Sequence, residues 1–265
     1  MSPTMNEATA LPIQRPRRFR FDWIWPVLRH PRGALAEITS QLQGVWLTPL
    51  VLLTLSGLLA VAVAGPIKIA AAQLGGVQLP PEAEFWTPEQ QAAYFQAQQA
   101  SSGPVFVYVF PALGAVLGTW LGWLVVAGLL HLVLTLLGGR VTSGSTLNLV
   151  AWASLPFVIR DLVRAGFMLY SKQLIESPGL SGFAPVGEGP LNALSVEVLK
   201  QIDLYGLWFA LLLMIGLQAA NALRAGKAVT AVALTLLVVL VLVVLPGVIA
   251  AQFGGLNIVT PFFGF

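Results

Sequence analysis

Long apolar segments separated by short polar ones form the main pattern of this chain of 265 residues. A helix needs roughly 20 apolar residues to cross the hydrocarbon core of a bilayer. Five stretches without Asp, Glu, Lys or Arg meet or approach that length, and they run about from Trp46 to Ile67, Pro104 to Gly139, Val141 to Ile159, Leu204 to Leu223 and Ala228 onward. The pattern predicts an all-α membrane protein whose domain, 46–251, is a bundle of five transmembrane helices at approximately 46–66, 104–138, 147–170, 203–223 and 228–251.

Composition supports this fold class. The mean hydropathy of +0.81 and the hydrophobic share of 57% exceed what the core of a soluble protein of this size could bury. The chain has no cysteine, which excludes disulfides, thiolate metal sites and cysteine-linked lipids. The helices alone are therefore expected to hold the protein in the membrane.

The basic residues predict the orientation. Outside the predicted helices, nine Lys and Arg fall in the N-terminal segment and in the connections around Arg140 and Arg224–Lys227, against three, Lys68, Lys172 and Lys200, in the opposite connections. Because cytoplasmic loops are enriched in Lys and Arg, the N-terminus is expected in the cytoplasm and the tail 252–265 outside it. The first 45 residues are polar, so we expect no cleaved signal peptide and insertion directed by the first crossing, into the plasma (inner) membrane.

Two parts make up the N-terminal segment. Residues 1–18 are predicted to be a disordered cytoplasmic tail, and residues 19–45 an interfacial amphipathic segment. Leu35, Ile38 and Leu42 fall on one helical face, which indicates a helix lying on the cytoplasmic leaflet; a short solvated helix packed on the bundle is the alternative. Aromatic and basic side chains in this region are expected to contact lipid headgroups: Arg17, Arg18, Arg20, Trp23, Trp25 and Arg29.

The two longer outside connections differ in character. Thr87-Pro88-Glu89 predicts a helix start, with the Gln/Ala-rich run to Ala100 extending the second crossing outward. Residues 171–200 are rich in Gly and Pro and predict an irregular loop in which a short helix could begin at Ser195. No internal repeat and no pair of broken crossings of the secondary-transporter kind is expected.

Three glycines of the second crossing, Gly114, Gly118 and Gly122, recur every four residues and share one helical face. Small residues at this spacing let two membrane helices approach closely. The face could pack against another helix of the same chain or against a second subunit, and both alternatives stay open.

Charges in the third crossing are the second candidate site. Arg160, Asp161 and Arg164 lie where charges are costly, and Asp161 and Arg164 are spaced to pair along one face. Pro156, just upstream, is expected to break the helix. The charges are either a polar element in a water-filled substrate route or a structural ion pair, with His131 of the second crossing as a candidate neighbour.

Signals for chemistry are sparse. The chain has no phosphate loop, HExxH or GxSxG motif, and its two histidines, His30 and His131, fall on different elements. We therefore expect no enzyme, no cofactor and no metal site. The basic cluster flanks a membrane segment, so lipid is expected as its partner and nucleic acid is not.

In their order and spacing, four segments from about Phe21 onward resemble the Yip (Ypt-interacting protein) domain family. They are the segment Asp22–Pro31, the close of the second crossing Leu137–Arg140, the run Ala151–Pro156 that ends in Leu-Pro, and the basic turn Asn221–Ala228. The resemblance implies five membrane helices, a cytoplasmic N-terminus and no enzymatic activity.

The same resemblance frames the functional hypotheses. Eukaryotic relatives bind Rab-type GTPases in vesicle traffic, and prokaryotic relatives are thought to assist ABC-type exporters. The Ala/Leu/Gly/Val-rich composition and the short arginine-rich N-terminus favour the prokaryotic, bacterial type. The leading hypothesis is a non-catalytic accessory or scaffold subunit that binds other membrane proteins, such as an ABC-type exporter, or itself. A small-solute transporter or channel and a membrane-shaping or trafficking factor are the alternatives.

Overall fold

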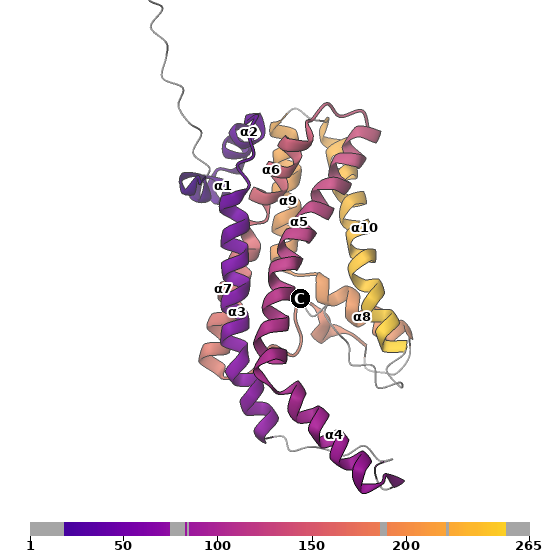
Figure 1. Cartoon of the computed structure of the whole chain (residues 1–265). Helices are drawn as coiled ribbons and strands as arrows, with labels where there is room; N and C mark the ends of the chain where they lie inside the picture. The colour runs from indigo at the N-terminus through magenta and orange to yellow at the C-terminus, as the bar shows by residue number, and fades with distance from the viewer. Residues whose placement is uncertain (1–18, 75–82, 84, 186–189, 221–222, 253–265) are drawn as a thin grey trace, which may run out of the picture.

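All regular structure in the described part of the chain is helical, which confirms the predicted class (Figure 1). This computed structural model describes residues 19–74, 83, 85–185, 190–220 and 223–252. The α-helices are α1 (Ile24–Arg29), α2 (Pro31–Ser40), α3 (Leu47–Leu74), α4 (Pro88–Ser101), α5 (Phe110–Leu136), α6 (Ser143–Ala153), α7 (Leu155–Ser171), α8 (Pro190–Gln201), α9 (Leu204–Ala219) and α10 (Ala225–Gln252). Short turns of other helix types occupy Phe21–Trp23, Val105–Val109 and Ser181–Phe183.

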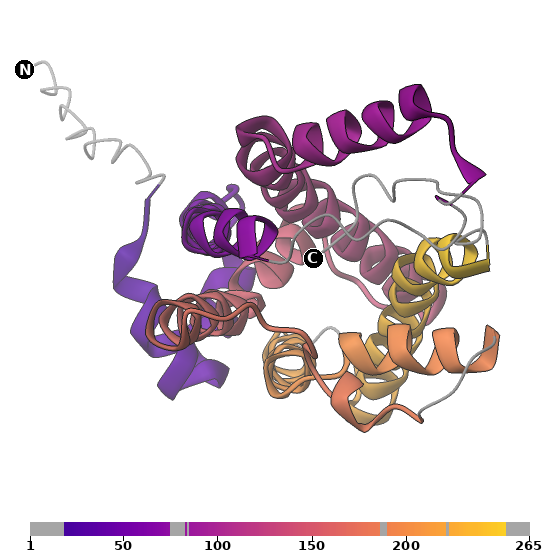
Figure 2. The same ribbon diagram turned by 90° about the horizontal axis from the view of Figure 1, so that it is seen from below.

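Four spans are long and apolar enough to cross a membrane: Leu47–Gln73, Val105–Leu136, Ser143–Ser171 and Ala225–Ile249. Leu191–Gln201 and Leu204–Ala219 make a fifth if this pair, bent by 60°, counts as one span. The chain is therefore a membrane protein with four or five crossings. Consecutive long helices run in opposite directions, while α8 lies across the others (Figures 1 and 2).

Two of the spans are interrupted, and only the break in the third was expected from the sequence. The third is divided at Ser154, between α6 and α7, because Pro156 in the first turn of α7 has no amide hydrogen to continue the helix. The break at this proline confirms the prediction. The other interruption, at Asp203, separates α8 from α9. Helix α9 begins at Leu204, close to the start predicted at residue 203, whereas α8 begins at Pro190 rather than near Ser195.

Helix α4 is a separate element rather than an extension of α5 (Figure 1). Its predicted start is confirmed: the Thr87 amide donates to Gln90 Oε1 at 2.9 Å, and the Gln90 amide donates to Thr87 Oγ1 at 3.4 Å, a reciprocal capping arrangement. The backbone amide of Glu89 and the Thr87 hydroxyl lower the pKa of the Glu89 carboxyl. The helix ends at Ser101, before the turn that leads into α5.

The amphipathic helix exists, but protein covers its apolar face. Leu35 and Ile38 of α2 are both 0% exposed, because α2 packs against α6 and α9. Leu42, predicted on the same face, lies beyond the end of α2 and is 99% exposed. The interfacial placement on a leaflet is thus not confirmed, and α2 packs on the bundle, as in the alternative interpretation.

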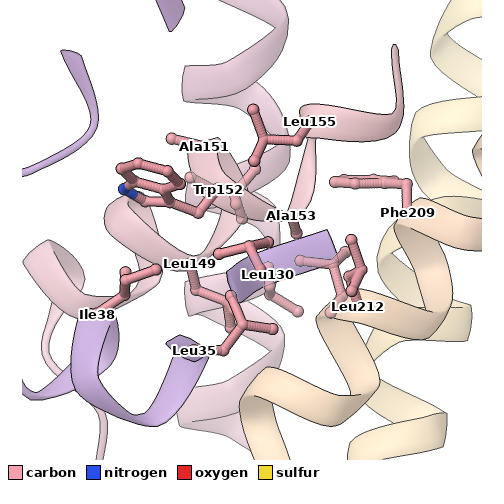
Figure 3. Packing of buried hydrophobic residues seen from close by; sticks show 14 of the residues in the cluster. Leu35, Ile38, Leu130, Leu149, Ala151, Trp152, Ala153, Leu155, Phe209 and Leu212 are labelled. Atoms are coloured by element: carbon pink, nitrogen blue, oxygen red, sulfur yellow. The ribbon is translucent and has the colours of Figure 1, made fainter. Parts of the chain in front are cut away.

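Most of the buried core lies at the end of the bundle where α2 packs. Side chains of α2, α5, α6 and α9 meet there, and Figure 3 shows Leu35, Leu130, Leu149 and Leu212 converging from those four helices. Helix α6 is the most enclosed element, since its residues from Leu149 to Ala153 are all at most 1% exposed. We call this end, which also holds Arg140, Arg224 and Lys227, the basic end.

Candidate functional site

Four charged side chains meet where α9 begins inside the bundle. Asp203 Oδ2 lies 3.8 Å from Arg160 Nη1 and 3.7 Å from Arg164 Nη2, so one carboxylate bridges two arginines of α7. Its other oxygen accepts a hydrogen bond from the Gly206 amide at 2.7 Å and so caps α9. The carboxylate thereby ties the interruption between α8 and α9 to α7.

Asp161 completes this charged cluster. Its Oδ1 lies 3.3 Å from Arg160 Nε, and its Oδ2 accepts a hydrogen bond from the Ser56 hydroxyl of α3 at 3.1 Å. Among the described ion pairs, Asp161 is joined to Arg160 and Arg164 to Asp203, so the predicted Asp161–Arg164 pair is not formed. The four side chains are between 15% and 28% exposed.

Sequence reasoning missed Asp203 and Ser56 and placed His131 nearby instead. The Nδ1 atom of His131 lies 3.4 Å from the Thr146 hydroxyl, which belongs to α6 rather than to the charged cluster. The position of Asp203 directly before an uncharged stretch was the available signal, because an Asp there is a favoured N-cap. Nothing in the sequence pointed to Ser56.

Chemically, the charged cluster is balanced. Two guanidinium groups face two carboxylates, and Arg160 also stacks over the Phe157 ring at 4.8 Å. Paired charges cost much less at depth than single ones, so this arrangement can join α3, α7 and α9. Among the described residues, no three His, Asp or Glu side chains are placed to hold a metal ion.

At Gly122, no described residue packs against the glycine face of α5. This residue is exposed, and a Cβ atom built on it would meet nothing within 4 Å. Gly114 and Gly118 are half-buried. The close approach between α3 and α5 occurs instead at Gly57, where a Cβ would lie 3.5 Å from that of Ala115. Among the described residues, none packs against Gly122 closely enough to require a glycine there.

One face of α6 holds the end of α2 and the linker between α2 and α3. Ser145 Oγ donates to the Thr39 carbonyl at 2.5 Å, and Trp152 Nε1 donates to the Val45 carbonyl at 2.9 Å. Between them Asn148, fully buried, accepts from the Val45 amide and donates to the Gln43 carbonyl, both at 2.9 Å. Backbone groups that would otherwise be buried unpaired are satisfied in this way.

A sequence profile described as the Yip1 domain matches residues 25–246 of the chain. The match spans well over half of the 265 residues. The chain belongs to the Yip1 domain family. Comparison with curated proteins and with solved structures found no significant match.

In this Yip1 domain, the segments that carry the resemblance meet at the basic end. Trp23 from the first segment packs edge-on against Trp152 from the third, with ring centroids 5.6 Å apart. Lys227 from the fourth donates to the Leu137 carbonyl of the second at 2.9 Å. That carbonyl ends α5, where Gly138, with φ at 81°, closes the helix. The four segments thus build one structural unit.

The predicted lipid contacts of the Yip1 domain divide into two groups. Trp23 is 3% exposed and donates to Glu37 Oε1 at 3.2 Å, so it packs in the protein core and does not face lipid. Trp25 is 60% exposed, and the Arg29 guanidinium stacks over its ring at 4.2 Å, a geometry that suits a headgroup layer. Two further predicted residues, Arg17 and Arg18, lie outside the described part of the chain.

Arg20, the remaining predicted contact, is held by the protein. Its guanidinium lies over the Trp23 ring at 3.8 Å and 2.9 Å from Asp22 Oδ2. The hydrogen bonds that Arg20 donates to the Asp22 carboxylate raise the pKa of the Arg20 guanidinium. Its backbone amide also donates to Thr48 Oγ1 at 2.8 Å, so the residue joins the N-terminal segment to α3.

Proposed function

We propose that this Yip1 domain protein is a non-catalytic scaffold that binds another integral membrane protein through the Gly122 face of α5. The exposure of Gly122 carries the proposal. A glycine in a membrane helix permits close backbone contact, yet at Gly122 the described part of this chain supplies no contact. Leu117 and Leu121 flank the glycine face and are exposed, so a second helix can reach it.

The charged cluster supports the same proposal. Its two arginines and two aspartates are engaged with one another, which suits a rigid bundle better than a route for a charged solute. Resemblance to prokaryotic relatives suggests an ABC-type exporter as the partner class, with the protein in the plasma (inner) membrane and its basic end in the cytoplasm.

A small-solute transporter is the second candidate, and the interrupted crossings favour it. Helices α7 and α9 both begin at breaks and contact each other, and the charges lie where α9 starts. Broken helices that meet at charged groups are a feature of many transporter binding sites. In that case, variants that neutralise the charged cluster in pairs should keep the fold and lose transport.

The scaffold proposal is tested by affinity purification of the full chain in mild detergent, followed by quantitative mass spectrometry. Gly122→Leu should lower recovery of the partner about tenfold, since a leucine side chain would separate the two backbones. Gly128→Leu is the matched control, because Gly128 is also an open glycine of α5 and lies about 120° away around the helix. Equal recovery of transporter components by both variants, or none by the wild type, would contradict the proposal.

A further inference from the structure

A hollow of about 370 Å³ opens at the basic end, between the start of α2 and the side of α9. It is lined by His30, Pro31, Arg32, Gly33 and Ile215. A Cβ atom built on Gly33 would meet nothing within 4 Å, so the hollow is open beside this residue. It is separate from the Gly122 face and from the charged cluster.

Basic side chains gather around this hollow. In the described part of the chain, neither Arg29 nor Arg32 has a carboxylate oxygen within 4.0 Å, whereas Arg20 is paired with Asp22 and Glu37. Arg29 is stacked on Trp25, and His30 and Arg32 are exposed at the rim. The local charge is thus positive and not neutralised by the protein, which suits an anionic ligand.

An apolar track leads away from the hollow along α9. Ile215 forms the inner wall, and Leu211 and Leu207 follow at four-residue spacing on the same helical face. Both leucines are exposed. The track descends about 12 Å from Ile215 to Leu207, in the direction of the membrane interior. A ligand with an anionic head and an apolar tail fits both parts, whereas a free anion would use only the first.

We propose that the hollow binds the headgroup of an anionic phospholipid, with phosphate oxygens accepting hydrogen bonds from Arg32 and His30. An acyl chain of the same lipid lies along Ile215, Leu211 and Leu207. This site lies where the headgroup layer meets the basic end, and bound lipid would fill the space between α2 and α9. It does not depend on the proposed protein contact at Gly122.

The test is native mass spectrometry of the full chain in mild detergent, titrated with phosphatidylglycerol or with phosphatidylcholine of the same acyl chains. The wild type should retain phosphatidylglycerol in preference to phosphatidylcholine. Arg32→Gln should weaken phosphatidylglycerol binding about fivefold, the effect of one basic residue near anionic lipid. Arg140→Gln, which removes an exposed charge elsewhere at the basic end, should leave binding unchanged.

A second pair of variants changes the volume of the hollow and no charge. Gly33→Leu should fill the hollow and abolish the preference for phosphatidylglycerol. Gly226→Leu, at an equally open glycine in the first turn of α10, should not. If Gly33→Leu fails to fold, the Arg32→Gln result decides, because Arg32 makes no ion pair whose loss would destabilise the described structure.

Three outcomes would overturn this proposal. The first is equal retention of the two lipids by the wild type. The second is an unchanged phosphatidylglycerol preference in a folded Gly33→Leu protein, or in Arg32→Gln if Gly33→Leu does not fold. The third is displacement of phosphatidylglycerol by an equal concentration of glycerol phosphate, which would show that the hollow binds a free phosphate without the acyl chain.

Discussion

The backbone amide of Val45 donates a hydrogen bond to Asn148 Oδ1 at 2.9 Å, across 103 residues of sequence. The same asparagine donates to the Gln43 carbonyl, so one side chain pairs two backbone groups of the linker between α2 and α3. This relationship fixes the N-terminal helix to the middle of the chain. It also makes Asn148 the residue whose loss should disturb the basic end most.

Asn148→Leu should lower the thermal unfolding midpoint in detergent, because it leaves the buried Val45 amide and the part-buried Gln43 carbonyl without their partner. Each such group costs about 1–3 kcal/mol. Asn148→Asp should also be destabilising: it keeps an acceptor for Val45, but it buries a carboxylate and sets one of its oxygens against the Gln43 carbonyl in place of the lost donor. If Asn148→Leu unfolds at the same temperature as the wild type, α6 does not hold the linker.

Sequence periodicity predicted the helices of this protein but not how they are joined. The uncharged stretches located the spans, because hydrocarbon length sets helix length. The α2 face formed by Leu35 and Ile38 was recognised as apolar, yet the pattern cannot tell whether lipid or protein covers such a face. Asn148 and Trp152 escaped notice as linker contacts because their partners are backbone atoms, which have no sequence signature.

The charged cluster was predicted only in part, for a similar reason. Local spacing suggested that Asp161 would pair with Arg164 on one helix face. In the fold, Arg164 is joined instead to Asp203, 39 positions away in the sequence, a partner that appears only once α9 packs beside α7. Spacing rules predict ion pairs within one helix and cannot predict a partner that comes from another helix.

Asp203→Asn removes the negative charge of this residue but keeps its role as the N-cap of α9. The amide oxygen can still accept from Gly206, but the arginines lose their shared carboxylate. The cost should lie between that of an exposed and that of a buried ion pair, about 1–3 kcal/mol, because the groups are partly exposed. Combining Asp203→Asn with Arg164→Gln should restore part of the lost thermal stability. No recovery in the double variant would argue against a shared ionic interaction.

Membrane orientation can be tested by cysteine labelling, since the chain has no cysteine of its own. Arg140 lies at the basic end, and Phe183 is an exposed residue in the connection between α7 and α8. The positive-inside rule predicts that Phe183→Cys reacts with an impermeant reagent in intact cells and that Arg140→Cys reacts only after permeabilisation. The reverse labelling pattern would invert the proposed topology.

The scaffold proposal is tested most directly by photo-crosslinking in living cells. A photoreactive amino acid replaces Gly122 in one variant and Gly128, on a different face of α5, in the other. The proposal predicts a discrete adduct with a second membrane protein from position 122 and none from position 128. The absence of a protein adduct at position 122, or the same adduct from both positions, would show that the Gly122 face is not a protein-binding surface.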